Sequence, residues 1–208
     1  MLASIVMRSP VRILKARISG LTLIEIMVAV AVLGVILAMA IPSMADLLER
    51  RRVTAAAEEV SGILTYAKAE TNAANSLLFV RFDPHATMSC AMVVTSAGGN
   101  NCRCHYPANN LCPTGGGRSL RLFQLPKTHV QFDAEGVWAA GNNYIRFARD
   151  QMTMETGNFQ VDVVGLGKGY TLRIEVNGIG RVRVCAPSAP AERNEAKPFQ
   201  RMSGYASC

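Results

Sequence analysis

Six cysteines and three histidines are the residues of this chain best suited to metal binding or covalent chemistry. An even number of cysteines in an oxidising compartment predicts disulfides, although sequence alone does not give their connectivity. Spacing favours a bond between Cys185 and Cys208, with the remaining four pairing among themselves: Cys90, Cys102, Cys104 and Cys112. The alternative is a zinc site built on the run Cys102-Arg103-Cys104-His105 and Cys112, but C-x-C lacks the usual two-residue gap. The histidines have no recognisable Ser or Cys nucleophile setting, so the sequence predicts no enzyme; they are His85, His105 and His129.

A second group of candidates is cationic and lies near the C-terminal end. In Gly180-Arg181-Val182-Arg183 the alternation of a strand puts both arginines on one face, roughly 6.5–7 Å apart. That distance is close to the phosphate spacing along one DNA strand. Matching the apolar faces of the two strands of this hairpin predicts that Ile174 lies opposite Val182.

This register would place Glu175 beside Arg181 and Arg173 beside Arg183 on an exposed face, with Lys168 in a preceding turn. The simpler interpretation of the same pattern is a solvated strand face in which Arg181 is paired with Glu175, because exposed ion pairs are common. The glycine-rich run 165–169 superficially resembles a phosphate loop, but no helical pattern follows it, so a hairpin turn is favoured.

The third candidate is a single carboxylate, Glu25, just inside an apolar run that ends at Ile41. Residues 21–41 would rise about 31 Å as a helix, close to the hydrocarbon thickness of a bilayer. A charge there is costly, so Glu25 is expected to be functional and to have a partner. A cut between Gly20 and Leu21 would create a suitable amine four residues away. An ordinary secretory signal and an unprocessed membrane anchor are alternatives that explain fewer of these residues.

The residues Gly20, Leu21 and Glu25, followed by Pro42, resemble the signal of type IV pilins and pseudopilins. The resemblance implies that a prepilin peptidase cuts after Gly20, that Leu21 is N-methylated, and that Glu25 serves filament assembly. It implies other pilins as partners and no cofactor. The motif Gly180–Arg183 also resembles that of the FimT-like minor pilins, which bind double-stranded DNA during natural transformation.

The elements that must position these residues can be read from periodicity. Residues 43–75 have apolar positions at helical spacing and continue the membrane helix as an amphipathic one. After Asn75 the period becomes two, and eight short strands are expected: 77–83, 88–95, 120–124, 129–132, 143–148, 159–164, 170–176 and 179–186. An N-terminal helix followed only by strands predicts an α+β fold, a long helix packed on an antiparallel sheet or small sandwich. This arrangement resembles the GspH/FimT branch of minor pseudopilins.

The distribution of charge gives the orientation. Four basic residues and no acid precede Glu25, so the N-terminus is expected in the cytoplasm and the rest in the periplasm. From Ser43 on, 18 Lys/Arg stand against 14 Asp/Glu, a mildly basic balance. The expected organisation is a leader (1–20), an inner-membrane helix (21–42), its continuation (43–75) and a β-domain (76–208) with a stapled tail. The expected function is DNA capture at a pilus tip; the alternative is a purely structural subunit priming a type II secretion or type IV pilus filament.

Overall fold

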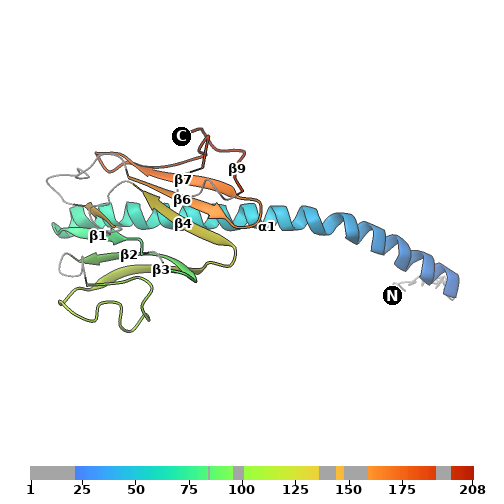
Figure 1. The fold of residues 1–208 in the computed structure, drawn as a ribbon, viewed down its shortest axis with the longest axis horizontal. Helices are drawn as coiled ribbons and strands as arrows, with labels where there is room; N and C mark the ends of the chain where they lie inside the picture. Colours follow the sequence, from blue (N-terminus) through green and yellow to red (C-terminus); the bar gives the residue numbers. More distant parts are fainter. Residues whose placement is uncertain (1–21, 84, 96–100, 136–143, 148–158, 191–197) are drawn as a thin grey trace, which may run out of the picture. The chain divides into compact units, whose positions relative to one another are not determined.

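The computed structural model describes residues 22–83, 85–95, 101–135, 144–147, 159–190 and 198–208. Gly20 and Leu21, and the peptide bond at which cleavage is predicted, lie outside this part of the chain. The chain divides into two compact units, residues 1–42 and 43–208. The helix α1 (Leu23–Ala74) continues through Pro42, and its residues belong to both units (Figure 1).

In the first unit the helix is almost uniformly apolar from Leu23 to Ile41. Every large apolar side chain in this stretch is between 51% and 78% exposed, so none is buried by the protein itself. The segment is long and apolar enough to cross a membrane by length and composition. Such a surface requires either lipid or other apolar helices around it.

The second unit is built from the C-terminal half of α1 and two sheets. The first sheet has the strand order β3-β2-β1-β5, and the second has the order β4-β6-β7-β8, with β9 beside β7. All the named neighbours are antiparallel except β9, which runs parallel to β7. The strand bounds are β1 (Leu78–Arg81), β2 (Met88–Thr95), β3 (Ser119–Pro126), β4 (Val130–Glu135), β5 (Tyr144–Phe147), β6 (Phe159–Gly165), β7 (Tyr170–Val176), β8 (Val182–Cys185) and β9 (Gln200–Arg201).

The helix and both sheets share one hydrophobic core. The buried stripe of α1 recurs every three or four residues, through Val53, Val60, Ile63 and Ala67. It packs against alternate residues of β1 in the first sheet and of β6 and β7 in the second. A helix laid on antiparallel sheets is the α+β fold that the sequence predicts, and the prediction is confirmed.

The other face of the first sheet carries a smaller cluster around the cysteines. Phe79, Met92 and Val94 lie with Cys90, Cys102 and Cys104, so the segment 101–118 covers this face. We call this segment the cysteine loop. The C-terminal tail contributes the short strand β9, which is not among the eight expected strands. The strand β8 begins at Val182, later than predicted, because residues 177–181 form the turn before it.

Candidate functional site

The carboxylate at the start of α1 is part of a helix cap. The Thr22 hydroxyl accepts a hydrogen bond from the Glu25 amide at 3.3 Å, and the Glu25 carboxylate accepts one from the Thr22 amide at 3.4 Å. This reciprocal pair is the capping box of the pattern Thr-x-x-Glu, a signal in the sequence that the interpretation of Glu25 had missed. Glu25 is exposed and has no basic side chain beside it among the described residues. Among the described residues, its charge is therefore not neutralised by a basic side chain.

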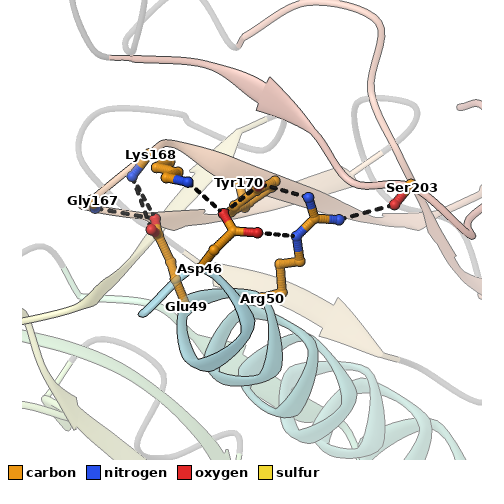
Figure 2. A network of polar contacts seen from close by, with 7 residues as sticks. All are labelled: Asp46, Glu49, Arg50, Gly167, Lys168, Tyr170 and Ser203. Atoms are coloured by element: carbon orange, nitrogen blue, oxygen red, sulfur yellow. Dashed lines mark hydrogen bonds and ion pairs between the residues drawn. The ribbon is translucent and has the colours of Figure 1, made fainter. Parts of the chain in front are cut away.

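A polar network ties the start of the second unit to the β6–β7 turn (Figure 2). Its residues, which we call the helix–hairpin network, are Asp46, Glu49, Arg50, Gly167, Lys168, Tyr170 and Ser203. Asp46, Glu49 and Arg50 are three and four positions apart, so they share one face of α1. The Asp46 carboxylate binds Arg50 Nε at 3.1 Å, and it accepts a hydrogen bond from the Tyr170 hydroxyl at 2.7 Å.

Lys168 belongs to this network through its side chain. Its ammonium group lies 2.9 Å from Asp46, and this hydrogen bond raises the pKa of Lys168. The same contact, with the Tyr170 hydroxyl, lowers the pKa of Asp46 from 3.8 to about 2. Lys168 is therefore paired with a carboxylate, with its side chain 57% exposed, and its contact with DNA phosphate stays a prediction.

The glycine-rich turn holds the second carboxylate of the network. The backbone amides of Gly167 and Lys168 donate to Glu49 at 3.1 and 2.9 Å. A Cβ at Gly167 would lie 2.6 Å from a Glu49 oxygen, and one at Gly165 would also collide with this side chain. The glycines thus let the Glu49 carboxylate approach the backbone. The turn that superficially resembles a phosphate loop therefore binds a carboxylate of the same chain.

Arg50 extends the network to the tail. Its guanidinium donates to the Tyr170 hydroxyl at 2.7 Å and to Ser203 Oγ at 3.0 Å, and it lies 4.3 Å from the centroid of the Tyr170 ring. Ser203 belongs to the tail that ends at Cys208. One helical residue therefore holds both the second sheet and the C-terminal segment.

The register of the last hairpin differs from the prediction by two residues. Val176 lies opposite Val182 and Ile174 opposite Val184, whereas Ile174 was expected to face Val182. The turn is longer than expected because Asn177 accepts hydrogen bonds from Gly180 and Arg181, with Gly180 at a φ of 73°. A shift of two positions preserves which side chains share a face, which is why alternation alone did not detect it.

This register separates the three arginines of the expected patch. Arg183 pairs with Glu175 at 2.8 Å, the partner that had been assigned to Arg181. Arg173 forms a bidentate pair with Asp162 at 2.7 and 2.9 Å, with the Arg173 side chain only 16% exposed and Asp162 only 2%. The prediction that Arg173 lies in an exposed patch is therefore wrong. Arg181 is exposed and forms no ion pair with a described residue.

The six cysteines form three disulfides. Cys185 is bonded to Cys208, which is the pairing that spacing favours, and the bridge holds the tail to the end of β8. Within the other group, Cys90 is bonded to Cys104 and Cys102 to Cys112, so the cysteine loop is pinned twice. No thiolate remains for zinc at Cys102, Cys104 or Cys112 in this structure.

A buried charge pair under the cysteine loop was missed by the sequence interpretation. The Arg81 side chain is 1% exposed and lies 3.3 Å from Asp83, whose other oxygen accepts the amide of Cys104 at 2.7 Å. Burial lowers the pKa of Arg81. The signal was the spacing of Arg81 and Asp83, which alternation places on one face of the chain. The pair joins the cysteine loop to β1.

The comparisons with known proteins concern mostly the N-terminal part. Residues 15–41 match the prokaryotic N-terminal methylation motif. Two fimbrial proteins of Pseudomonas aeruginosa are each 47% identical over 49 residues, which is 24% of this chain. The match spans only 32% of their length, about a third of the curated relatives. The type IV minor pilin FimU of Pseudomonas aeruginosa superposes with a TM-score of 0.43 at 12% identity, over 74% of this chain and 96% of that one.

The methylation motif covers the same residues that carry the helix cap at Glu25. It includes Gly20, Leu21, the capping pair Thr22 and Glu25, and the apolar helix. The chain therefore carries the prokaryotic N-terminal methylation motif at the start of a long apolar helix, and in this region it is similar to fimbrial proteins.

Proposed function

We propose that this protein is a minor pseudopilin of the GspH/FimT type that assembles into a filament from the inner membrane. Prepilin peptidase removes residues 1–20, Leu21 is N-methylated, and the apolar helix holds the protein in the membrane with the second unit in the periplasm. Neighbouring pilins then take the helix into a filament, near its tip. The observation that carries the proposal is Glu25, an exposed carboxylate in the methylation motif that has no basic partner among the described residues.

The structural role is preferred over DNA capture because of how the cations are used. Lys168, Arg173 and Arg183 each have a carboxylate partner within 2.9 Å in this chain. Binding phosphate through any of them requires giving up that pair. Assembly, in contrast, uses the apolar face of α1 and the charge of Glu25, which remain unpartnered within the described chain.

The test distinguishes the effect of the Glu25 charge on assembly from the effect of the capping hydrogen bonds between Thr22 and Glu25. In Glu25→Gln the capping contact is retained, because Gln also serves in a capping box, but the charge is lost. We expect this variant to enter the membrane at the parent level and to be absent from sheared filaments, since neutralising the residue makes the span more apolar. Thr22→Ala is the matched control: it removes the cap and keeps the charge, and should enter filaments.

Immunoblots of membrane and filament fractions measure both quantities. Glu25→Gln found in filaments at the parent level would overturn the proposed role of the charge. Equal losses for Glu25→Gln and Thr22→Ala would assign the effect to helix capping instead.

DNA capture at the pilus tip stays as the second candidate, on one observation. Arg181 is exposed and unpaired among the described residues, and the side chain of nearby Arg183 is 52% exposed beside a single glutamate. Two phosphate contacts would give weak, salt-dependent and sequence-independent binding to double-stranded DNA. A gel shift with the full-length protein in uncharged detergent should show duplex binding at low salt that is lost in R181Q/R183Q. Absence of binding in the parent protein leaves the structural role alone.

A further inference from the structure

An apolar groove of the second unit lies between α1 and the segment that joins β3 to β4. We call it the α1–β3 groove, and its volume is about 500 Å³. Its apolar walls are formed by Ala55, Ala56, Phe123, Leu125, Pro126 and Val130. Binding sites in proteins typically have volumes of about 300–1,000 Å³, so this groove is large enough to take several side chains of a partner.

The groove exists because α1 carries small side chains at this point. Ala55 and Ala56 leave the space beside β3 unfilled, whereas the next turns of the helix fill their side of the core with larger residues such as Val60 and Ile63. As a result, Phe123 and Leu125 are only half-buried. An exposed apolar surface with polar residues at its rim is typical of a site that binds another molecule.

The strand beside the groove has an open edge. β3 is the outermost strand of the first sheet, and among the described residues it has a strand neighbour on one side only, β2. The other edge of β3 presents amide and carbonyl groups that no named strand pairs. An extended segment can add to such an edge as a further strand, in which main-chain hydrogen bonds supply affinity and side-chain sites supply specificity.

Alternation along β3 decides which side chains of an added strand would enter the groove. Phe123 and Leu125 face α1 and pack against the core. Arg121 faces the same way and pairs with Glu59 of α1 at 2.9 Å. Gln124 faces the cysteine loop instead, where it donates to the Cys104 carbonyl. Every second side chain of a strand paired with β3 would therefore point toward α1, at intervals of about 6.5–7 Å.

The charges around the groove favour an acidic partner. The one carboxylate in its lining, Glu59, is neutralised by Arg121. Arg52 lies at the mouth, is exposed, and forms no ion pair or side-chain hydrogen bond with the residues that the structure describes. Thr128 and His129 add groups there that can form hydrogen bonds. The groove thus has an apolar centre and one positive charge without a partner among the described residues.

We propose that the α1–β3 groove binds an extended segment of a partner protein in which an apolar side chain and a carboxylate are two residues apart. The segment adds to the outer edge of β3, the apolar side chain fills the space between Ala56 and Phe123, and the carboxylate pairs with Arg52. This contact uses residues of the second unit alone. It goes beyond the proposed assembly function, which uses Glu25 and the apolar helix, and gives the protein a second surface for meeting other proteins.

The test measures binding of a short synthetic peptide to the full-length protein in uncharged detergent, by fluorescence anisotropy. The peptide carries the photoreactive apolar residue p-benzoylphenylalanine at its centre and aspartate two residues away on either side, with serine and threonine elsewhere. A second peptide has lysine in place of aspartate. The protein variant is R52E, and the matched control is R51E, which makes the same change of charge at the adjacent exposed arginine outside the groove.

The parent protein and R51E should bind the aspartate peptide about fivefold more tightly than the lysine peptide, which is the effect of one exposed ion pair. In R52E this preference should be lost or reversed. An unchanged preference in R52E would overturn the inference, and so would failure of the parent protein to bind the aspartate peptide. Equal loss of preference in R52E and R51E would also overturn it, because the effect would then be one of net charge.

Irradiation of the complex shows where the peptide lies. Mapping of the cross-linked protein should find the adduct in residues 52–59 of α1 or in residues 123–130. An adduct in the apolar helix, residues 23–41, would mean that the peptide had entered the detergent micelle. An adduct elsewhere in the second unit would place the binding site elsewhere, and either result would overturn the inference.

Two further measurements identify the occupant and separate this inference from the proposed function. If light scattering without peptide shows a dimer that R52E dissociates and R51E does not, the occupant is a second copy of this chain and the partner proposed is wrong. If Glu25→Gln enters filaments at the parent level while the peptide binds as expected, the assembly role of Glu25 fails and the groove stands. If Glu25→Gln is absent from filaments and the peptide does not bind, only the inference about the groove fails.

Discussion

The pair formed by Arg173 and Asp162 gives the most direct test of how the arginines are used. Arg173→Gln removes two hydrogen bonds to a carboxylate that is 2% exposed. Removing one member of a buried ion pair destabilises a protein by about 3–5 kcal/mol. For a domain of this size each kcal/mol corresponds to about 2–4 °C, so the melting temperature should fall by about 10 °C.

The matched control is Arg183→Gln on the neighbouring strand. It removes the same charge and the ion pair with Glu175, but the Arg183 side chain is 52% exposed. An exposed pair of this kind contributes at most about 1 kcal/mol, so the melting temperature should change by no more than a few degrees. Near-ultraviolet circular dichroism on heating measures both variants in the same detergent.

A double variant isolates the interaction between the two residues. Arg173→Gln combined with Asp162→Asn leaves no stranded charge, so it should be less destabilised than the sum of the single variants, by at least about 1 kcal/mol. If Arg173→Gln melts within a few degrees of Arg183→Gln, the carboxylate is not held as described. The assignment of Arg173 to the interior of the sheet would then be wrong.

The remaining predictions concern the leader, the network, the turn and the tail. Intact-mass measurement of membrane-extracted protein should show the loss of residues 1–20 and one methyl group on Leu21; a mature start at Ile41 would contradict it. Because the pKa of Asp46 is lowered to about 2, its contribution to stability is complete above about pH 4 and is lost as the pH falls toward 2. Asp46→Asn should therefore flatten the decline of the melting temperature in that window, and an unchanged profile would show that Asp46 is not held by Lys168. Gly169→Ala should destabilise the protein by more than about 1 kcal/mol, since φ is 79° and a Cβ would collide with the Pro198 carbonyl. Gly178→Ala should be tolerated, because its Cβ would meet open space. Equal melting temperatures of the two variants would refute this. Replacing Cys185 and Cys208 by Ser should lower stability by about 3 kcal/mol and make the tail sensitive to limited proteolysis, and a resistant tail would mean that β9 and Ser203 suffice to hold it.

The fold could be predicted from the sequence because its signals are local. The change from helical to alternating periodicity after Asn75 located the end of α1 to within one residue, and most strand bounds agree to within one or two. The missed strand, β9, has only two residues, both exposed, so it has no alternating pattern. It exists because Gln200 donates to the Gly169 carbonyl, a contact that follows from tertiary structure.

The partners of the arginines in the last hairpin could not be predicted to the same degree, because they depend on the pairing register of the strands. Alternation assigns a residue to a face, but a shift of two positions changes the partner and leaves the face unchanged. Arg183 and not Arg181 therefore meets Glu175. One signal was available for Arg173: Asp162 is the single acid in an otherwise largely apolar strand, and the short turn after Gly165 brings that strand back onto β7.

The contrast between satisfied and free charge distinguishes two regions of the second unit. Around the β6–β7 turn and in the last hairpin, the polar contacts hold strands and tail to each other and to α1. Removing such a contact should lower stability, because the partner loses its hydrogen bonds. Arg51 and Arg52 are exposed, and they form no ion pair or side-chain hydrogen bond with the residues that the structure describes. Their replacement by Gln should leave the melting temperature the same, and this difference separates surface charges from the charges that hold the fold together.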